Sequence, residues 1–310
     1  MSESLNPRQE AQDKLGGRYE VRVLEPSPPA LDGNLDDPAA RGDVPAGREL
    51  VSPVSDGDKT WDELAREDGE LADWCSARWL GAWKRLPPVP ATLAETRAAL
   101  HQIAAQVLSP ARQAGTGSEI SLRFTRGGFG TPFFGSDEQV RVDGVELVVV
   151  KAGEERRTGI ESVSHAAAFV GTIDAADLDT APLAIDPAAA SFLADWFGFA
   201  TLVTAEVRAR AGVALEPSAT NLWSEHFDIA VELGPEASGQ RAAYGGSPGD
   251  EHHAEPYVYV GPWEQEQSGP LWNATTFGGA EILYSDLLAA EDQIGMATDL
   301  FEACLRELTT

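Results

Sequence analysis

The stretch NLWSEHFDIAVEL, residues 221–233, contains one apolar and one polar set of side chains at alternating positions. Successive side chains of a β-strand point to opposite faces of a sheet. We therefore expect the apolar set to face a core and the polar set to face away from it. The apolar set is Trp223, Phe227, Ile229, Val231 and Leu233, and the polar set includes His226, Asp228 and Glu232.

The segments RAAYGGSPGDEHHAEP, residues 241–256, and YVYVGPW, residues 257–263, follow this strand. If Val258 and Val260 face the same core, the aromatic residues between them lie on the polar face. Aromatic walls around a few convergent polar groups are typical of a small-molecule pocket. The expected polar face then holds Tyr257, Tyr259 and Trp263 together with His226 and Asp228.

This face is the predicted functional site. Its candidate catalytic residues are His226, Asp228 and Asp250, and its candidate ligand-binding residues are Tyr257, Tyr259, Trp263 and His252. Imidazole and carboxylate side chains of this region are also ligands that Zn, Fe or Mn accepts, although no recognised metal spacing is present. These side chains are His226, Asp228, Asp250, Glu251, His252, His253 and Glu255. An acid–base or hydrogen-bonding site without a metal, and a solvated polar strand beside a charged loop, are the alternatives.

Residues 245–249, GGSPG, match the G-x-S-x-G pattern of a nucleophile elbow. An elbow uses the backbone N–H of the residue after the serine as an oxyanion donor. Here that residue is Pro248, which has no N–H. We therefore predict that Ser247 is not a nucleophile and that the glycines form a turn.

Residues 126–135, RGGFGTPFFG, form a glycine-rich stretch that invites comparison with phosphate loops. Neither the dinucleotide fingerprint nor a Walker Gly-Lys-Ser/Thr is present. We expect a turn that folds Phe129 over the sheet. The alternative is that this stretch binds an anion with help from Arg123 or Arg126, so both arginines are candidate ligand-binding residues.

The composition limits the partners of the chain. Its 310 residues are 43% hydrophobic, which is enough for a sizeable core, and 50 acidic against 23 basic residues give a formal charge of −27. Nucleic acids and anionic membranes need basic residues to neutralise phosphate, so we expect neither as a partner. Two distant cysteines and an N-terminus without a signal-peptide pattern favour the cytoplasm. Asp195 within the apolar window 188–205 favours a buried helix over a membrane span.

The order of elements predicts an α+β fold, a mostly antiparallel sheet from residues 119–151 and 222–283 with helices packed on one face. Residues 1–59 are expected to form a flexible N-terminal arm with a strand at 18–24, and residues 60–310 a single domain. Helices are expected to begin at Thr60, at Thr92 and at Asp186-Pro187, and the helix from Thr92 is expected to end at Pro110. A short helix is expected at 163–171 and a final amphipathic helix at the end of the chain. Before that final helix we expect a strand at Trp272–Phe277 and then the segment 281–284.

Three motifs carry a resemblance. They are W-x-E-H-F-D at 223–228, Y-G-x-S-P-G-D at 244–250 and P-Y-x-Y-V-x-P-W at 256–263, accompanied by RGGFGTP at 126–132. Together they resemble a group of uncharacterised actinobacterial proteins. More remotely, the order of elements is similar to a bacterial family of unknown function. The resemblance covers about residues 60–310 and implies no catalytic residues.

Two classes of function follow from these patterns. The first is a small-molecule enzyme or binding protein that uses the face around His226 and Asp228. The second is a non-catalytic protein-interaction module that uses the same face for docking. A concave face favours the first class, and a flat face favours the second.

Overall fold

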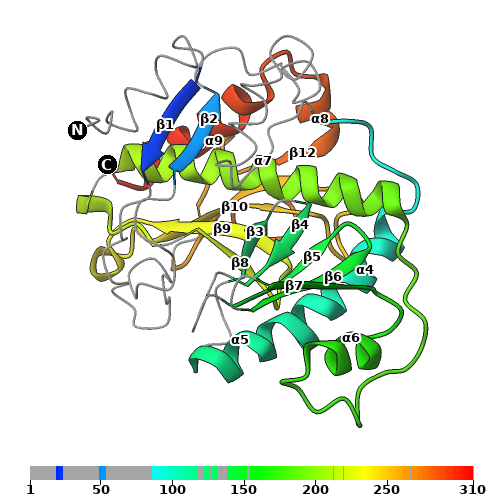
Figure 1. Cartoon of the computed structure of the whole chain (residues 1–310). Coiled ribbons are helices and arrows are strands. Elements are labelled where there is room, and N and C mark those ends of the chain that lie inside the picture. The colour runs from blue at the N-terminus through cyan, green and yellow to red at the C-terminus, as the bar shows by residue number, and fades with distance from the viewer. Residues whose placement is uncertain are drawn as a thin grey trace, which may run out of the picture.

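The computed structural model (Figure 1) describes two strands near the N-terminus and most of the chain from residue 86 onward. The described residues are 19–23, 49–53, 86–117, 122–125, 127–131, 134, 138–151, 154–211, 213–218, 220–264 and 267–309. The helix expected from Thr60 and the candidate Arg126 lie outside these ranges.

Two antiparallel five-stranded sheets confirm the predicted α+β class. In each sheet every strand pairs with its neighbours in the chain, so both are simple meanders. The first sheet contains β3 (Arg123–Thr125), β4 (Gly128–Gly130), β5 (Gln139–Asp143), β6 (Glu146–Lys151) and β7 (Glu154–Gly159). The second contains β8 (Asn221–Trp223), β9 (Asp228–Leu233), β10 (Ala242–Ser247), β11 (Tyr257–Pro262) and β12 (Ala280–Leu283).

The two β-rich segments therefore form two sheets, where the sequence predicted one. Their edges meet at an isolated bridge between Leu122 and Leu222, in which the Leu222 N–H donates to the Leu122 carbonyl at 2.6 Å. Both leucines are fully buried. The contact between β3 and β8 is thus a short apolar seam between two meanders.

One long helix, α7 (Pro187–Ala211), is the centre of the core. It packs on β9 and β10 of the second sheet, on β3 and β4 of the first, and on α4 and α9 (Figure 1). Its first turn begins as expected, because the Asp186 side chain accepts a hydrogen bond from the Ala189 N–H at 2.9 Å. By length and composition α7 can cross a membrane, but 76% of its apolar window is buried inside the protein, as is typical of a core helix.

The other helices cover the same side of the second sheet or flank the first. They are α4 (Leu93–Ile103), the π-helical turn η1 (Ala104–Leu108), α5 (Ser109–Thr116), α6 (Val163–Val170), α8 (Tyr284–Ala289) and α9 (Gln293–Leu308), with short 3₁₀ turns η2 (Val213–Leu215) and η3 (Glu236–Ser238). Their buried apolar side chains and those of both sheets form one core cluster.

Pro110 does not end a helix, contrary to the prediction. It lies at the start of α5, immediately after the π-helical turn η1, and the helical path continues to Thr116. Proline removes one backbone donor and clashes with the carbonyl four residues earlier. The wider π-turn shifts that hydrogen-bond ladder by one residue, so the helix passes the proline without breaking.

Two other sequence expectations are wrong. Gly128–Gly130 is strand β4 and not a turn, because its backbone pairs with β3 and β5. Both ends of the strand are glycine since a Cβ at Gly130 or Gly128 would come within 2.4 Å of Arg141 or 2.5 Å of Val142. Trp272–Phe277 is a loop beside β12 and not a strand. The Asn273 side chain pairs with the backbone N–H and carbonyl of Glu281, so it takes the place of a neighbouring strand there.

The strand expected at 18–24 is confirmed as β1 (Tyr19–Val23). It pairs antiparallel with β2 (Glu49–Pro53), a strand that the sequence analysis had left inside the N-terminal arm.

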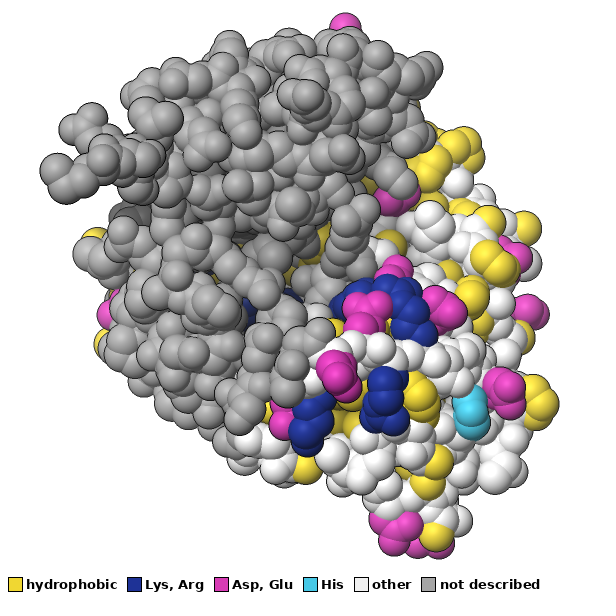
Figure 2. Space-filling view, in the orientation of Figure 1, with side chains coloured by type: hydrophobic (Ala, Val, Ile, Leu, Met, Phe, Trp, Pro, Cys, Tyr) yellow, Lys and Arg dark blue, Asp and Glu magenta, His cyan; other side chains and the backbone are white. Residues whose placement is uncertain are grey.

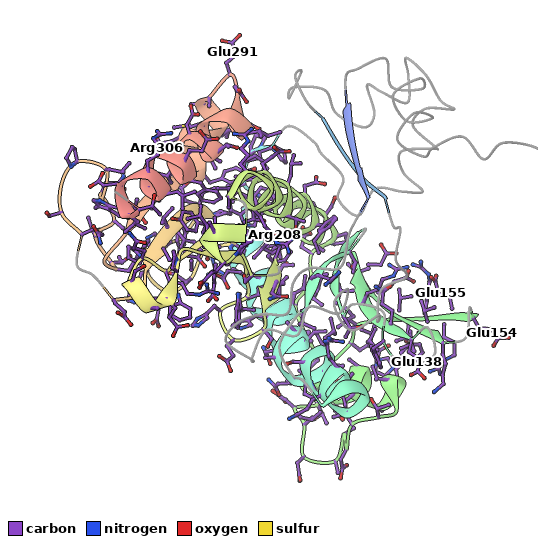
Figure 3. All side chains as sticks on the ribbon, turned by 90° about the vertical axis from the view of Figure 1, so that its left-hand side faces the viewer. Glu138, Glu154, Glu155, Arg208, Glu291 and Arg306 are labelled. Carbon is purple, nitrogen blue, oxygen red and sulfur yellow. The ribbon has the colours of Figure 1, made fainter. Side chains whose placement is uncertain are left out.

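The outer edge of the first sheet is polar. Charged residues of both signs alternate across β5, β6 and β7, and Arg157 forms ion pairs with Asp143, Glu146 and Glu155. Figure 2 shows acidic and basic side chains side by side in the region where Figure 1 places these strands, and Figure 3 shows Glu154 pointing outward from the edge. Such a charged edge strand resists pairing with another chain.

Candidate functional site

The turn between β8 and β9 places the first candidate residues. Trp223 pairs with Asp228, and the four residues between them form the turn. Paired residues of antiparallel strands share a face. Trp223 therefore lies on the Asp228 face and not, as predicted from alternation, on the Phe227 face. The reason is that strand alternation stops at the turn, so counting by twos across it is invalid.

Phe227 ends this turn with a left-handed backbone, at a φ of 58°. Its ring is buried and stacks on His101 of α4 at 5.1 Å between centroids. The His101 Nε2 is 2.9 Å from the Ser224 carbonyl oxygen, so α4 holds the turn at two points. This anchoring leaves His226 exposed at the rim of the second sheet.

A row of small side chains forms the floor of the candidate site. Ala230, Ala243 and Gly261 lie on the face of the second sheet that is opposite α7. Gly245 lies in the same floor, and a Cβ there would come within 2.9 Å of the Tyr259 ring. Small residues in the floor, with large ones around it, leave a hollow in the sheet surface.

The next residue, Gly246, faces the other way. A Cβ there would lie 2.8 Å from the Ala200 Cβ of α7. The two consecutive glycines thus face opposite sides of the sheet: Gly246 lets α7 approach it closely, and Gly245 leaves room for the Tyr259 ring on the other side.

The hollow is a cavity of about 580 Å³. Nearly all of the predicted site residues line it, although they come from separate strands and loops. The lining residues are Trp223, His226, Asp228, Ala230, Glu232, Ala243, Ser247, Asp250, His252, His253, Tyr257, Tyr259, Gly261, Trp263, Thr276 and Phe277. Val258 and Val260 face the core, as expected.

Asp228 is the most deeply placed carboxyl of the cavity wall, with 6% of its surface exposed. Its Oδ2 accepts a hydrogen bond from the Tyr259 hydroxyl, while its Oδ1 is shielded from solvent and has no hydrogen-bond partner. Burial raises the pKa of the Asp228 carboxyl above its ordinary value, and the bond from Tyr259 offsets only part of that increase. Burial and the neighbouring Asp228 also raise the pKa of Tyr259.

Asp250 has the opposite environment. Its Oδ1 accepts the backbone N–H groups of His252 and His253 at 2.7 and 2.8 Å, and its Oδ2 accepts the Tyr257 hydroxyl at 2.7 Å. Burial acts to raise the pKa of Asp250, but these bonds and that from the His253 ring lower it below its ordinary value. The two aspartates of one cavity are therefore shifted in opposite directions.

His253 links Asp250 to a third carboxyl. Its Nδ1 is 3.1 Å from Asp250 Oδ1, and its Nε2 is 3.0 Å from Glu281 Oε2. A neutral imidazole has one N–H and one lone pair, so it can donate to only one of the two carboxylates. The Nε2 also lies 3.3 Å from Thr276 Oγ1, so the His253 ring connects two carboxylates and a hydroxyl.

Arg97 of α4 fixes the loop that carries Asp250. Its guanidinium donates to the carbonyl oxygens of Pro248 and Asp250, each at 3.2 Å. Gly249 lies between them at a φ of 95°, and a Cβ there would come within 2.3 Å of Arg97 Nη1. The expected turn is thus wrong for Gly245 and Gly246, which belong to β10; only Pro248 and Gly249 form a turn, which Arg97 clamps, and no helix follows it. Ser247 is 4% exposed and its Oγ accepts the Gly249 N–H at 3.2 Å.

A buried ion pair closes the far end of the cavity. Arg241 Nη2 lies 3.0 Å from Glu232 Oε2, and both side chains are at most one-tenth exposed. The Arg241 guanidinium also lies over the Trp263 ring at 5.3 Å. Behind this end, Arg208 of α7, which is labelled in Figure 3, donates to the Ser218 carbonyl at 2.6 Å. The Ser218 Oγ in turn accepts the Glu232 N–H.

The metal alternative finds no support in the described ranges, where no three His, Cys, Asp or Glu side chains form a group that could hold a metal ion. Glu255 has a structural role instead, because its carboxylate accepts the Ser285 N–H at 2.7 Å in the first turn of α8.

One of the two arginines proposed for anion binding is described by the structure. Arg123 lies on β3 of the first sheet and does not line the cavity, and Arg126 lies outside the described residues. The role of Arg97 was not predictable from the sequence, because nothing local connects a residue of α4 with the loop at 248–250. Thr276 and Phe277 were not expected at the site because residues 272–277 were predicted to form a strand, and no sequence pattern connects Glu281 with His253.

Comparison of this chain with protein-family models, with curated proteins and with solved structures finds no match. The resemblance to the actinobacterial proteins stays a prediction.

Proposed function

We propose that this protein binds a small organic molecule in the cavity on the open face of the second sheet, and that it does so in the cytoplasm. The observation that carries the proposal is the concave shape of that face. Its volume of about 580 Å³ lies in the range of ligand pockets, which is roughly 300–1,000 Å³. A flat face would have favoured docking of another protein.

The lining supports the same proposal. Trp223, Tyr257, Tyr259 and Phe277 supply apolar contact area, and a few polar groups project between them. Phe277 belongs to the loop before β12, and its ring lies 6.3 Å from Tyr257 and 6.2 Å from Tyr259. The loop before β12 therefore forms one wall of the cavity.

Asp228 and Asp250 are the groups that we propose to exchange protons with a bound molecule. Two carboxyls whose pKa values are shifted apart suit the roles of proton donor and proton acceptor. Asp228 holds its proton more tightly than an ordinary aspartate, and Asp250 holds it less tightly. His226 and His252, both exposed at the rim, are further candidates for contacts with the ligand.

The alternative proposal is a protein-interaction module. One observation favours it: Trp263, at the rim of the cavity, is 44% exposed and is one of the few large apolar side chains so exposed among the described residues. Its ring is held by Arg241, so it is a rigid contact for either kind of partner.

The test is a thermal-shift screen against a metabolite library with two variants. Ala243→Phe places a ring in the floor of the cavity, and Ala237→Phe makes the same change on the exposed turn η3. A ligand that binds the native state raises the unfolding temperature. We expect hits with the wild-type chain and with Ala237→Phe that are lost with Ala243→Phe. Hits that persist in Ala243→Phe, or a screen without hits, would contradict the proposal.

A further inference from the structure

The charges of the cavity wall are unbalanced. Among the described residues that line it there is no Lys or Arg, but there are three acidic side chains: Asp228, Glu232 and Asp250. Arg241 neutralises Glu232 from behind. Asp250 is stabilised by two backbone N–H groups, by Tyr257 and by His253. Asp228 is thus the lining carboxyl with the least compensation.

The Tyr259 hydroxyl donates to Asp228 Oδ2, and Asp228 Oδ1 is buried without a hydrogen-bond partner. The Asp228 backbone N–H and the nearby His226 and His101 favour the ionised carboxylate, but burial outweighs them. A buried carboxylate without enough donors is costly, and such groups in a native protein call for a specific explanation. A positive charge in the cavity beside Asp228 would supply the missing compensation, because Coulomb attraction is strong where water is excluded.

The aromatic walls favour the same kind of ligand. The faces of Trp and Tyr rings attract cations, and cages of such rings are used to bind ammonium groups. Trp223, Tyr257 and Tyr259 line the cavity together with Asp228. A neutral polyhydroxylated ligand would suit the rings as well and could donate to Asp228 Oδ1, but only a cation would also favour the ionised carboxylate over the protonated form that burial favours.

We propose that the ligand of this cavity is an organic cation, a protonated amine carried on an apolar or aromatic body, with its ammonium group beside Asp228. This inference rests on the proposed function, since it names the ligand class of the same cavity. The charge of −27 on the chain attracts cations and repels anions at long range.

The test uses pairs of probes that differ only in charge. A panel of primary aryl- and alkylamines, such as 2-phenylethylamine, is compared by calorimetric titration with the alcohols in which a hydroxyl replaces the ammonium group, such as 2-phenylethanol. We expect at least one amine to bind the wild-type chain about tenfold more tightly than its alcohol, which corresponds to roughly 1.4 kcal/mol.

The variants separate Asp228 from the general acidity of the chain. Asp228→Asn should weaken amine binding about tenfold and leave alcohol binding unchanged. Glu225→Gln removes an exposed acidic charge from the same turn and should change neither. Circular dichroism checks that both variants are folded, and the comparison of amine with alcohol on the wild-type chain remains decisive if Asp228→Asn does not fold.

The outcomes distinguish this inference from the proposed function. If no amine binds more tightly than its alcohol, or if Glu225→Gln weakens amine binding as much as Asp228→Asn does, the inference is wrong. The proposed function still stands in that case if the metabolite screen gives hits that Ala243→Phe abolishes. If the screen gives no such hits and no amine binds, both are wrong.

Discussion

Replacing Phe227 by Ala tests how the turn that carries His226 is held. Phe227 is 1% exposed, and its ring stacks on His101 and meets Phe129 and Phe197 edge-on, at 5.0 and 5.2 Å between centroids. The rings come from α4, β4 and α7, so the side chain joins both sheets to the helices.

The expected cost of Phe227→Ala is about 3–5 kcal/mol of unfolding free energy, the range for truncating a buried Phe. Ala keeps a Cβ at a positive φ, so it does not relieve the strained backbone. Glycine does relieve it, by about 1–2 kcal/mol. Phe227→Gly should therefore be no more destabilising than Phe227→Ala, although glycine loses more chain entropy on folding.

The assay is urea denaturation followed by tryptophan fluorescence, with His226→Ala as the matched control. His226 is the preceding residue of the same turn and is exposed, so its truncation should cost less than about 1 kcal/mol. If His226→Ala proves as destabilising as Phe227→Ala, His226 has a structural role and the reasoning about the site is refuted.

Three further predictions concern the cavity. Because the folded-state pKa of Asp228 is raised, its ionisation weakens folding: the cost is absent below the unfolded value of about 4 and grows as the pH rises through the folded value. The stability of Asp228→Asn relative to wild type should thus increase as the pH of the urea titrations is raised above about 4, and a difference that stays constant would show that the pKa of the carboxyl is not raised. Arg241→Ala leaves Glu232 buried without its counter-charge and should lower the free energy of unfolding by about 3–5 kcal/mol. The double variant Arg241→Met, Glu232→Leu should recover most of that loss. If Arg241→Ala is as stable as wild type, the ion pair does not contribute to stability as argued. A fluorophosphonate probe should not label Ser247, because it is buried and is followed by a proline; stoichiometric labelling that disappears in Ser247→Ala would overturn this prediction.

The sequence alone determined which side chains share a face within a strand. Alternation assigned Ile229 and Val231 to the core and Asp228 to the open face, and the same argument placed Tyr257 and Tyr259. It succeeded because the two-residue period follows from the geometry of the extended backbone, whatever lies around it. The helix start at Asp186-Pro187 was predictable for the same local reason, since a capping side chain reaches only its own first turn.

Only the tertiary structure decided where those faces end and what covers them. Trp223 changed face because a four-residue turn separates it from Asp228, and Gly128–Gly130 is a strand because its backbone pairs with both β3 and β5. The hydrogen bonds from Arg97 to the loop at 248–250 span sequence separations of 151 and 153 residues. Such contacts depend on how α4, α7 and the two meanders pack together, and that packing is settled by shape and close approach over the whole core, which no local pattern contains.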